Sequence, residues 1–152
     1  MRIVIGADHG GYVLKENLLA YLKANGFEVL DYGTDSLESV DYPDIAAQVG
    51  KAIQEDKADR GILICGSGVG VCIAANKVNG VYAGLCHDAY SASQGVEHDG
   101  MNVLCLGGRV VGDELARLLV DRFLAAEYHG DRPDGERHAR RVGKIKTIEK
   151  QG

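Results

Sequence analysis

Short apolar runs alternate along the chain with longer stretches in which apolar residues recur every three or four positions. The short runs predict five β-strands, at residues 3–6, 27–30, 61–65, 81–86 and 103–106. The periodic stretches predict a helix that ends near Gly26, then helices at 43–55, from about 70, at 89–96, at 113–126 and at 136–150. Strands and helices that alternate in this way are typical of a parallel sheet.

The helix predicted at residues 113–126 has the clearest amphipathic pattern. One face carries a mainly apolar stripe, formed by Leu115, Leu118, Leu119, Arg122 and Phe123. We expect this stripe to pack on the sheet.

Polar and glycine residues cluster directly after the predicted strands. They are Asp8 and His9 after the first strand, Cys65 to Gly70 after the third, His87 and Asp88 after the fourth, and Gly107, Gly108 and Arg109 after the fifth. Parallel strands end at the same edge of a sheet, and ligands of open α/β sheets bind there. The pattern therefore predicts an α/β domain spanning residues 1–152, with helices on both faces of the sheet and its site at this edge.

Residues 61–77, GILICGSGVGVCIAANK, are the most informative segment. A β-prone run leads into Cys65, and Gly66, Gly68 and Gly70 then alternate with Ser67 and Val69 before a helical pattern begins. Glycines let backbone N–H groups face an anion, and the start of a helix favours negative charge. A thiol at this position is a candidate base or nucleophile beside groups that stabilise an anion.

This loop matches no standard nucleotide-binding signature. The P-loop pattern is absent, and the G-x-G-x-G spacing differs by one position from the dinucleotide-binding pattern. A phosphatase loop would carry an arginine shortly after its cysteine, where this chain has Val69, Gly70 and Val71. The alternative is a tight turn without function, which would leave Cys65 and Ser67 without a role.

Three further groups are candidates for ligand contact. Asp8 and His9 precede two glycines at the ligand-binding edge, and His98 and Asp99 are predicted to follow the fourth helix. Arg137 and Arg141 lie four residues apart in a basic cluster, so both can face one phosphate or carboxylate. A loop histidine and a solvated basic face are the simpler alternatives.

Composition narrows the class of protein. The chain has 152 residues, a net charge of -5 and 45% hydrophobic residues, which fits one globular domain and argues against a general nucleic-acid surface. No apolar run reaches membrane-spanning length, and the first residues lack the features of a signal peptide. We therefore expect a cytoplasmic protein with no nucleic-acid or membrane partner.

The cysteines and histidines show no metal-binding spacing. Cys65, Cys72, Cys86 and Cys105 form no C-x-x-C pair, and the 5 histidines include no H-E-x-x-H motif. We expect reduced, mostly buried thiols, no catalytic metal and no cofactor.

Several motifs together resemble the ribose-5-phosphate isomerase B family, which includes the galactose-6-phosphate isomerase subunits. They are GADHGG (6–11), VDYPD (40–44), the segment 61–77, Glu97-His98 followed by Asn102-Val103, LGGRVVG (106–112) and ERHARRV (136–142). The resemblance covers nearly the whole chain. It implies a Rossmann-like three-layer α/β/α sandwich and a metal-free aldose–ketose isomerase. It also implies a homodimer or dimer of dimers in which the terminal helix reaches a partner subunit and the sites are shared.

The resemblance also implies a role for each matching residue. Cys65 would be the base that moves a proton between C1 and C2, His98 would help to open the sugar ring, and Ser67 would lie nearby. The remaining candidates would bind the substrate: Asp8, His9, Tyr42, Gly66, Gly68, Val69, Gly70, Asp99, Arg109, Arg137 and Arg141. Ribose 5-phosphate is the expected substrate.

Two departures from the family pattern bear on the substrate. Asp99 stands where an asparagine usually follows the histidine, and an ionised aspartate accepts hydrogen bonds but does not donate them. The segment 131–135, DRPDG, reads as an insertion before the terminal arginines. Tetrose, allose or galactose phosphates, or a free sugar, are therefore alternative substrates.

Two other classes of function are compatible with the sequence. A thiol hydrolase or acyl transferase could use Cys65 as nucleophile and His98 as base, although Leu63 stands where a nucleophile elbow has its first glycine. The chain could also be a sugar-phosphate sensor without activity. The presence of Cys65, His98 and both arginines argues against that alternative.

Overall fold

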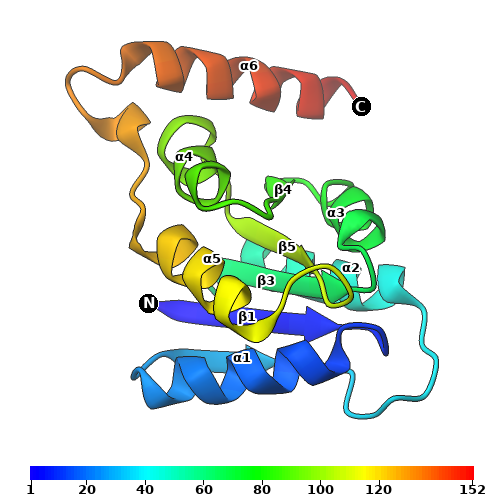
Figure 1. The fold of residues 1–152 in the computed structure, drawn as a ribbon. Coiled ribbons are helices and arrows are strands. Elements are labelled where there is room, and N and C mark those ends of the chain that lie inside the picture. Colours follow the sequence, from blue (N-terminus) through cyan, green and yellow to red (C-terminus); the bar gives the residue numbers. More distant parts are fainter.

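The computed structural model describes residues 1–152 and is built on a five-stranded sheet in which every pairing is parallel. The strands are β1 (Arg2–Ala7), β2 (Glu28–Asp31), β3 (Arg60–Cys65), β4 (Ala83–Leu85) and β5 (Val103–Gly107). Their order across the sheet is β2-β1-β3-β5-β4 (Figure 1). The predicted strands and their parallel arrangement are confirmed.

Helices connect successive strands and cover both faces of the sheet. They are α1 (Tyr12–Ala24), α2 (Tyr42–Gln54), α3 (Val69–Ala75), α4 (Ala89–Asp99), α5 (Asp113–Ala125), the 3-10 turn η1 (His129–Asp131) and α6 (Glu136–Gln151). The result is a Rossmann-like α/β/α sandwich. None of these helices combines the length and the apolar character needed to cross a bilayer.

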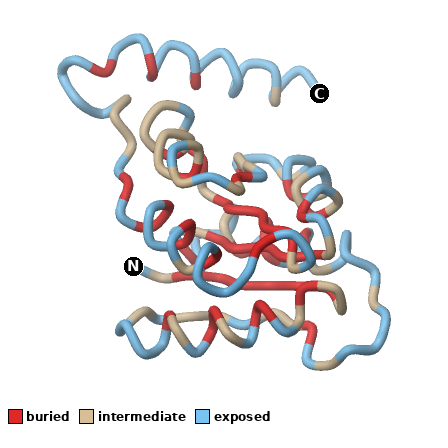
Figure 2. Tube along the Cα trace, in the orientation of Figure 1, coloured by how far each residue is buried: buried red, intermediate tan, exposed pale blue.

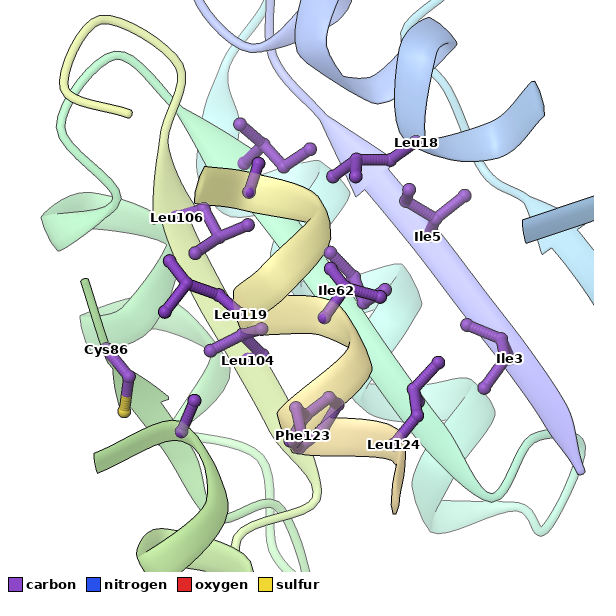
Figure 3. Close-up of a cluster of buried hydrophobic side chains, with 14 of the residues drawn as sticks. Ile3, Ile5, Leu18, Ile62, Cys86, Leu104, Leu106, Leu119, Phe123 and Leu124 are labelled. Atoms are coloured by element: carbon purple, nitrogen blue, oxygen red, sulfur yellow. The ribbon is translucent and has the colours of Figure 1, made fainter. Parts of the chain in front are cut away.

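Alternation along the central strands builds two separate cores. In β3, Ile62 and Ile64 join a cluster with α1, α4 and α5, part of which Figure 3 shows. Leu63 and Cys65 point to the other face and join a cluster with α2 and α3. Each fully buried aliphatic side chain contributes about 1.5–3 kcal/mol. Both faces of β3 are therefore fixed by packing, which sets the position of Cys65 at its end.

The terminal helix α6 is less buried than the rest. It packs against α4 and η1, and only His138 and Val142 along it are buried. Figure 2 shows α6 as a largely exposed rod beyond the α4 side of the sandwich. Its basic residues are consequently held away from most of the sheet edge.

Two elements differ from the sequence-based prediction at the β4 edge. Helix α4 continues to Asp99 and ends at Gly100, whose φ of 68° is a helix-terminating conformation. His98 and Asp99 therefore lie in its last turn, whereas the sequence predicted them in the loop that follows. Strand β4 is shorter than predicted because Tyr82 donates its N–H to the side chain of Asn102 instead of to a strand.

The predicted stripe on α5 was partly wrong. Its buried residues are Ala116, Leu119, Val120, Phe123 and Leu124, and Figure 3 shows Leu119 and Phe123 facing the sheet. Leu115 and Leu118 remain 39% and 41% exposed. The helix is rotated so that the small Ala116 and the β-branched Val120 face the strands.

Candidate active site

Three loops meet at the carboxyl edge of the sheet, after the adjacent strands β1, β3 and β5. Their backbones touch because glycines stand at the contacts. A Cβ on Gly11 would lie 2.6 Å from the carbonyl oxygen of Ile64, and one on Gly108 would lie 2.6 Å from that of Gly10. Any larger residue would push these loops apart.

Cys65 lies at the centre of this edge, as the last residue of β3. Its side chain is 5% exposed, and its Sγ accepts a hydrogen bond from the backbone N–H of Gly68 at 3.2 Å. Gly68 reaches this position with a φ of 81°, which favours glycine. An N–H donor aimed at sulfur stabilises negative charge there.

The loop after Cys65 offers further donors. The N–H groups of Gly66, Ser67 and Gly70 make no hydrogen bond within the chain, while Val69 donates its N–H to Ser67 Oγ at 3.2 Å. The loop is held from the β5 side, because Gly108 donates to the Cys65 carbonyl and Arg109 to that of Gly66. Free, oriented N–H groups beside a thiol can stabilise an oxyanion formed next to it.

A cavity of about 700 Å³ opens over this loop. It is lined by Asp8, Tyr42, Cys65, Gly66, Ser67, Val69, Gly70, Ile73, Arg109 and Val110. Most of the predicted site residues thus surround one space. Ile73 and Val110 were not predicted, because nothing distinguishes them locally from other apolar surface residues.

The loop after β1 supplies Asp8 and positions His9. Asp8 is 7% exposed, and its Oδ1 accepts the N–H of Gly10 at 2.9 Å. Nδ1 of His9 accepts the N–H of Val40 at 3.3 Å. His9 therefore ties this loop to the segment that leads into α2, which begins at Tyr42. His9 itself does not line the cavity.

His87 has a supporting role that the sequence did not suggest. Its Nε2 accepts the N–H of Gly107 at 3.0 Å, directly before the loop that carries Arg109. The next residue, Asp88, caps α4 by accepting the N–H of Ser91 at 2.7 Å. Both polar residues after β4 therefore brace backbone and do not face the cavity.

The other predicted residues gather elsewhere, where α4, η1 and α6 meet. The rings of His98 and His138 are stacked with centroids 4.1 Å apart, and Arg137 Nε lies 3.5 Å from His138 Nε2. Burial lowers the pKa of His138, and nearby His98, Arg137 and Arg141 lower it further. Arg137 and Arg141 themselves are exposed.

None of this second group lines the Cys65 cavity. Asp99 borders a different cavity of about 450 Å³, together with Gln94 and Met101. A single chain thus presents two separate sets of candidate residues, one around Cys65 and one around His98.

The comparisons with known proteins agree with this architecture. The model of the Ribose/Galactose Isomerase family matches residues 3–145. The chain is 47% identical over 150 residues to ribose-5-phosphate isomerase B of Escherichia coli, covering 99% of this chain and 97% of that protein. It is 44% identical to the D-erythrulose-4-phosphate isomerase of Pectobacterium atrosepticum, with 86% of each protein covered.

A solved structure shows the same agreement in three dimensions. The ribose-5-phosphate isomerase B of Clostridium thermocellum superposes with a TM-score of 0.94 at 51% identity, covering 99% of both chains. Strand order, loop glycines and sequence therefore lead to one conclusion: the chain belongs to the ribose/galactose isomerase family, as a sugar-phosphate isomerase of the ribose-5-phosphate isomerase B type.

Proposed function

We propose that this protein interconverts ribose 5-phosphate and ribulose 5-phosphate, with Cys65 as the base. The main support is the hydrogen bond from the Gly68 N–H to the Cys65 sulfur, beneath a cavity bordered by unpaired N–H groups. An isomerase has to remove a weakly acidic C–H proton and stabilise the enediolate that results. A positioned thiolate beside oriented donors meets both needs.

The proton balance of the reaction follows from this arrangement. The Cys65 thiolate takes the proton from C2 of the open-chain aldose, and the electron pair moves toward the carbonyl oxygen on C1. N–H groups of Gly66, Ser67 and Gly70 stabilise the enediolate oxygens. The hydroxyl proton on O2 moves to O1, and the Cys65 thiol returns its proton to C1, which gives the ketose and restores the thiolate.

The substrate is held by polar groups around the cavity. Asp8, Tyr42 and Arg109 line it and contact the sugar, and His9 assists from the same edge. Arg137 and Arg141 bind the phosphate as a pair on one face of α6. His98 moves a proton at the ring oxygen when the cyclic sugar opens.

Such a site requires two copies of the chain, because the Cys65 set and the His98 set are separate within one chain. Apolar side chains support association: Val69, Ile73 and Val110, on the rim of the cavity, are 46%, 59% and 58% exposed. In the proposed dimer or dimer of dimers, one subunit brings His98, at the end of α4, and Arg137 and Arg141, on α6, to the Cys65 cavity of its partner. Residues 1–152 act as one domain.

A tetrose phosphate is the second candidate substrate. It is favoured by the relative named D-erythrulose-4-phosphate isomerase and by Asp99, which cannot donate a hydrogen bond to a sugar oxygen when ionised. The shorter sugar would reach the same phosphate-binding arginines only if the partner helix lies closer to Cys65.

Proton NMR in deuterated buffer containing a chelator tests the proposal with ribose 5-phosphate and erythrulose 4-phosphate in parallel. We expect conversion of ribose 5-phosphate by the wild type and its loss in Cys65→Ala. Cys72→Ala is the matched control, because this half-buried thiol does not line the cavity. Near-normal turnover by folded Cys65→Ala would refute the base assignment, and a burst with a covalent thioester would favour a hydrolase instead.

A further inference from the structure

Three histidines converge at the junction of α4, η1 and α6, although His98 is distant in the sequence from His129 and His138. The rings of His98 and His129 have centroids 5.7 Å apart in an edge-to-face arrangement, and His138 is stacked on His98. In Figure 1 the segment that links α5 to α6 runs past α4, which brings η1 to this junction. Clustered imidazoles are the commonest basis of a transition-metal site.

We propose that Glu97, His98 and His129 form a binding site for Zn²⁺. One ligand atom from each of these half-buried residues lies within 4.8 Å of the other two. Ligand atoms around a tetrahedral Zn²⁺ ion are about 3.4 Å apart, given bonds of about 2.1 Å. Small rotations of these side chains close that difference, and two histidines with one glutamate leave a fourth position for water.

The surroundings orient His98 for this role. The side-chain amide of Gln94 lies 3.0 Å from its Nδ1. With the amide turned so that its oxygen accepts the Nδ1–H, the lone pair of Nε2 is available for a metal. The stacked ring of His138 is 5% exposed and covers one face of His98. The imidazole of His98 is therefore held between two neighbours instead of turning freely in solvent.

Local charge determines which metals can bind. Arg137 lies against His138, and Arg141 is one turn further along α6, so the junction repels cations that bind through charge alone. Zn²⁺ forms strong bonds to imidazole, whereas Mg²⁺ and Ca²⁺ prefer oxygen ligands. The site is expected to take Zn²⁺ and to reject Mg²⁺.

Bound Zn²⁺ would also stop isomerisation, and this second part rests on the proposed function. A metal on His98 occupies the lone pair that the imidazole needs for proton transfer at the ring oxygen. Zn²⁺ is thus an inhibitor here and not a cofactor, which is consistent with a reaction that Cys65 performs as base.

Calorimetric titration of chelator-treated, full-length protein with ZnCl₂ tests the site without reference to activity. We expect one ion per chain, no binding of MgCl₂, and binding weakened by more than about tenfold in His129→Asn and in Glu97→Gln. Cys65→Ala controls for zinc captured by the active-site thiol and should bind as the wild type does. Absence of binding, or binding unchanged in His129→Asn, overturns the site.

Enzyme assays with the His129→Asn variant test the inhibitory role, because His129 has no part in the proposed catalytic mechanism. We expect Zn²⁺ to inhibit the wild type in parallel with site occupancy, and the His129→Asn variant to keep its basal activity and resist inhibition. Stoichiometric binding without inhibition overturns the inhibitory role and leaves the site standing. If the protein binds Zn²⁺ but isomerises no sugar phosphate, both the proposed function and the inhibitory role are refuted. The zinc site itself is supported in that case.

Discussion

The Cys65 sulfur and the Gly68 backbone N–H are joined by a hydrogen bond of 3.2 Å. This contact depends on the backbone of Gly68, whose φ is 81°. A Cβ at this position would lie 2.6 Å from Leu85 Cδ1 and 2.7 Å from the carbonyl carbon of Leu106. Both the left-handed backbone and the close packing at residue 68 therefore require glycine there. A side chain at this position would displace the N–H group from the Cys65 sulfur.

Gly68→Ala should therefore damage catalysis more than stability. The left-handed conformation costs about 1–2 kcal/mol for alanine, and the clash displaces the N–H from sulfur. Loss of one donor in an anion-stabilising site typically lowers kcat by about 100-fold or more. Steady-state kinetics together with urea denaturation would measure both effects.

Gly80→Ala provides the matched control for this variant. Gly80 has a φ of 85°, no atom lies within 4 Å of the position that an added methyl group would take, and the residue does not line the Cys65 cavity. We expect Gly80→Ala to show the conformational cost of the left-handed backbone without the clash, and therefore a smaller loss of stability with normal kcat. An equal loss of kcat in both variants would show that backbone strain, and not the donor to Cys65, limits activity.

Arg137→Ala should weaken binding of the phosphorylated substrate. A charge-assisted hydrogen bond contributes about 1.5–3 kcal/mol, so KM is expected to rise by about tenfold to 100-fold with a smaller change in kcat. Lys146→Ala is the control, because Lys146 is exposed and lies nine residues after Arg137, on the opposite face of α6. An unchanged KM in Arg137→Ala would rule out contact with the phosphate.

Local sequence predicted the strand and the glycine loop that place Cys65 in the candidate site, whereas contacts of Tyr42 and Arg109 with the substrate were expected only from the family resemblance. The apolar run that ends at Cys65 identifies a buried strand, and the alternating glycines after it identify a loop with accessible N–H groups. Both signals depend on residues close together in the chain, so neither required knowledge of the tertiary structure.

The His98 side could not be predicted in the same way. Gly95 weakens the helical pattern before His98, and the strength of Gly100 as a helix terminator becomes apparent only from its φ. The contact between His98 and His138 spans 40 residues and depends on how α6 leaves the sandwich. That path is set by the packing of η1 and α4, for which the sequence has no local signal.

Asp59→Asn should reduce stability at neutral pH and have little effect near pH 2. Hydrogen bonds from the Arg2 side chain and backbone lower the pKa of Asp59 to about 2. Because the pKa of Asp59 is lower in the folded state, its ion pair with Arg2 contributes fully to the free energy of unfolding above the unfolded-state pKa of about 3.9. This contribution is lost as the pH falls through 2. Both side chains are partly exposed, at 38% and 43%, so the effect should be small.

Urea midpoints at pH 6, 4 and 2.5 would measure this dependence. Asp35→Asn is the control, because Asp35 is exposed and makes no salt bridge. If the urea midpoints of Asp59→Asn and the wild type differ by the same amount at all three pH values, the ion pair with Arg2 is not the source of the difference.

Lys15→Ala should be strongly destabilising, because Lys15 is fully buried and its Nζ lies 2.9 Å from Asp31 Oδ1. The same carboxylate oxygen accepts the N–H of Gly33, whose carbonyl in turn accepts the N–H of Ala7 at the end of β1. Removing the lysine leaves Asp31 without its cation and opens a void beside α1. Breaking such a pair costs about 3–5 kcal/mol, and we expect the lower end because Asp31 is 33% exposed.

Urea denaturation at fixed protein concentration would measure this loss, with Lys51→Ala as the control. Lys51 is 69% exposed and 3.7 Å from Glu55, a geometry that contributes little. Lys15→Met fills the void without restoring the charge, so it should recover only part of the lost stability. Full recovery in Lys15→Met would mean that packing, and not the ion pair with Asp31, fixes the loop between β2 and α2.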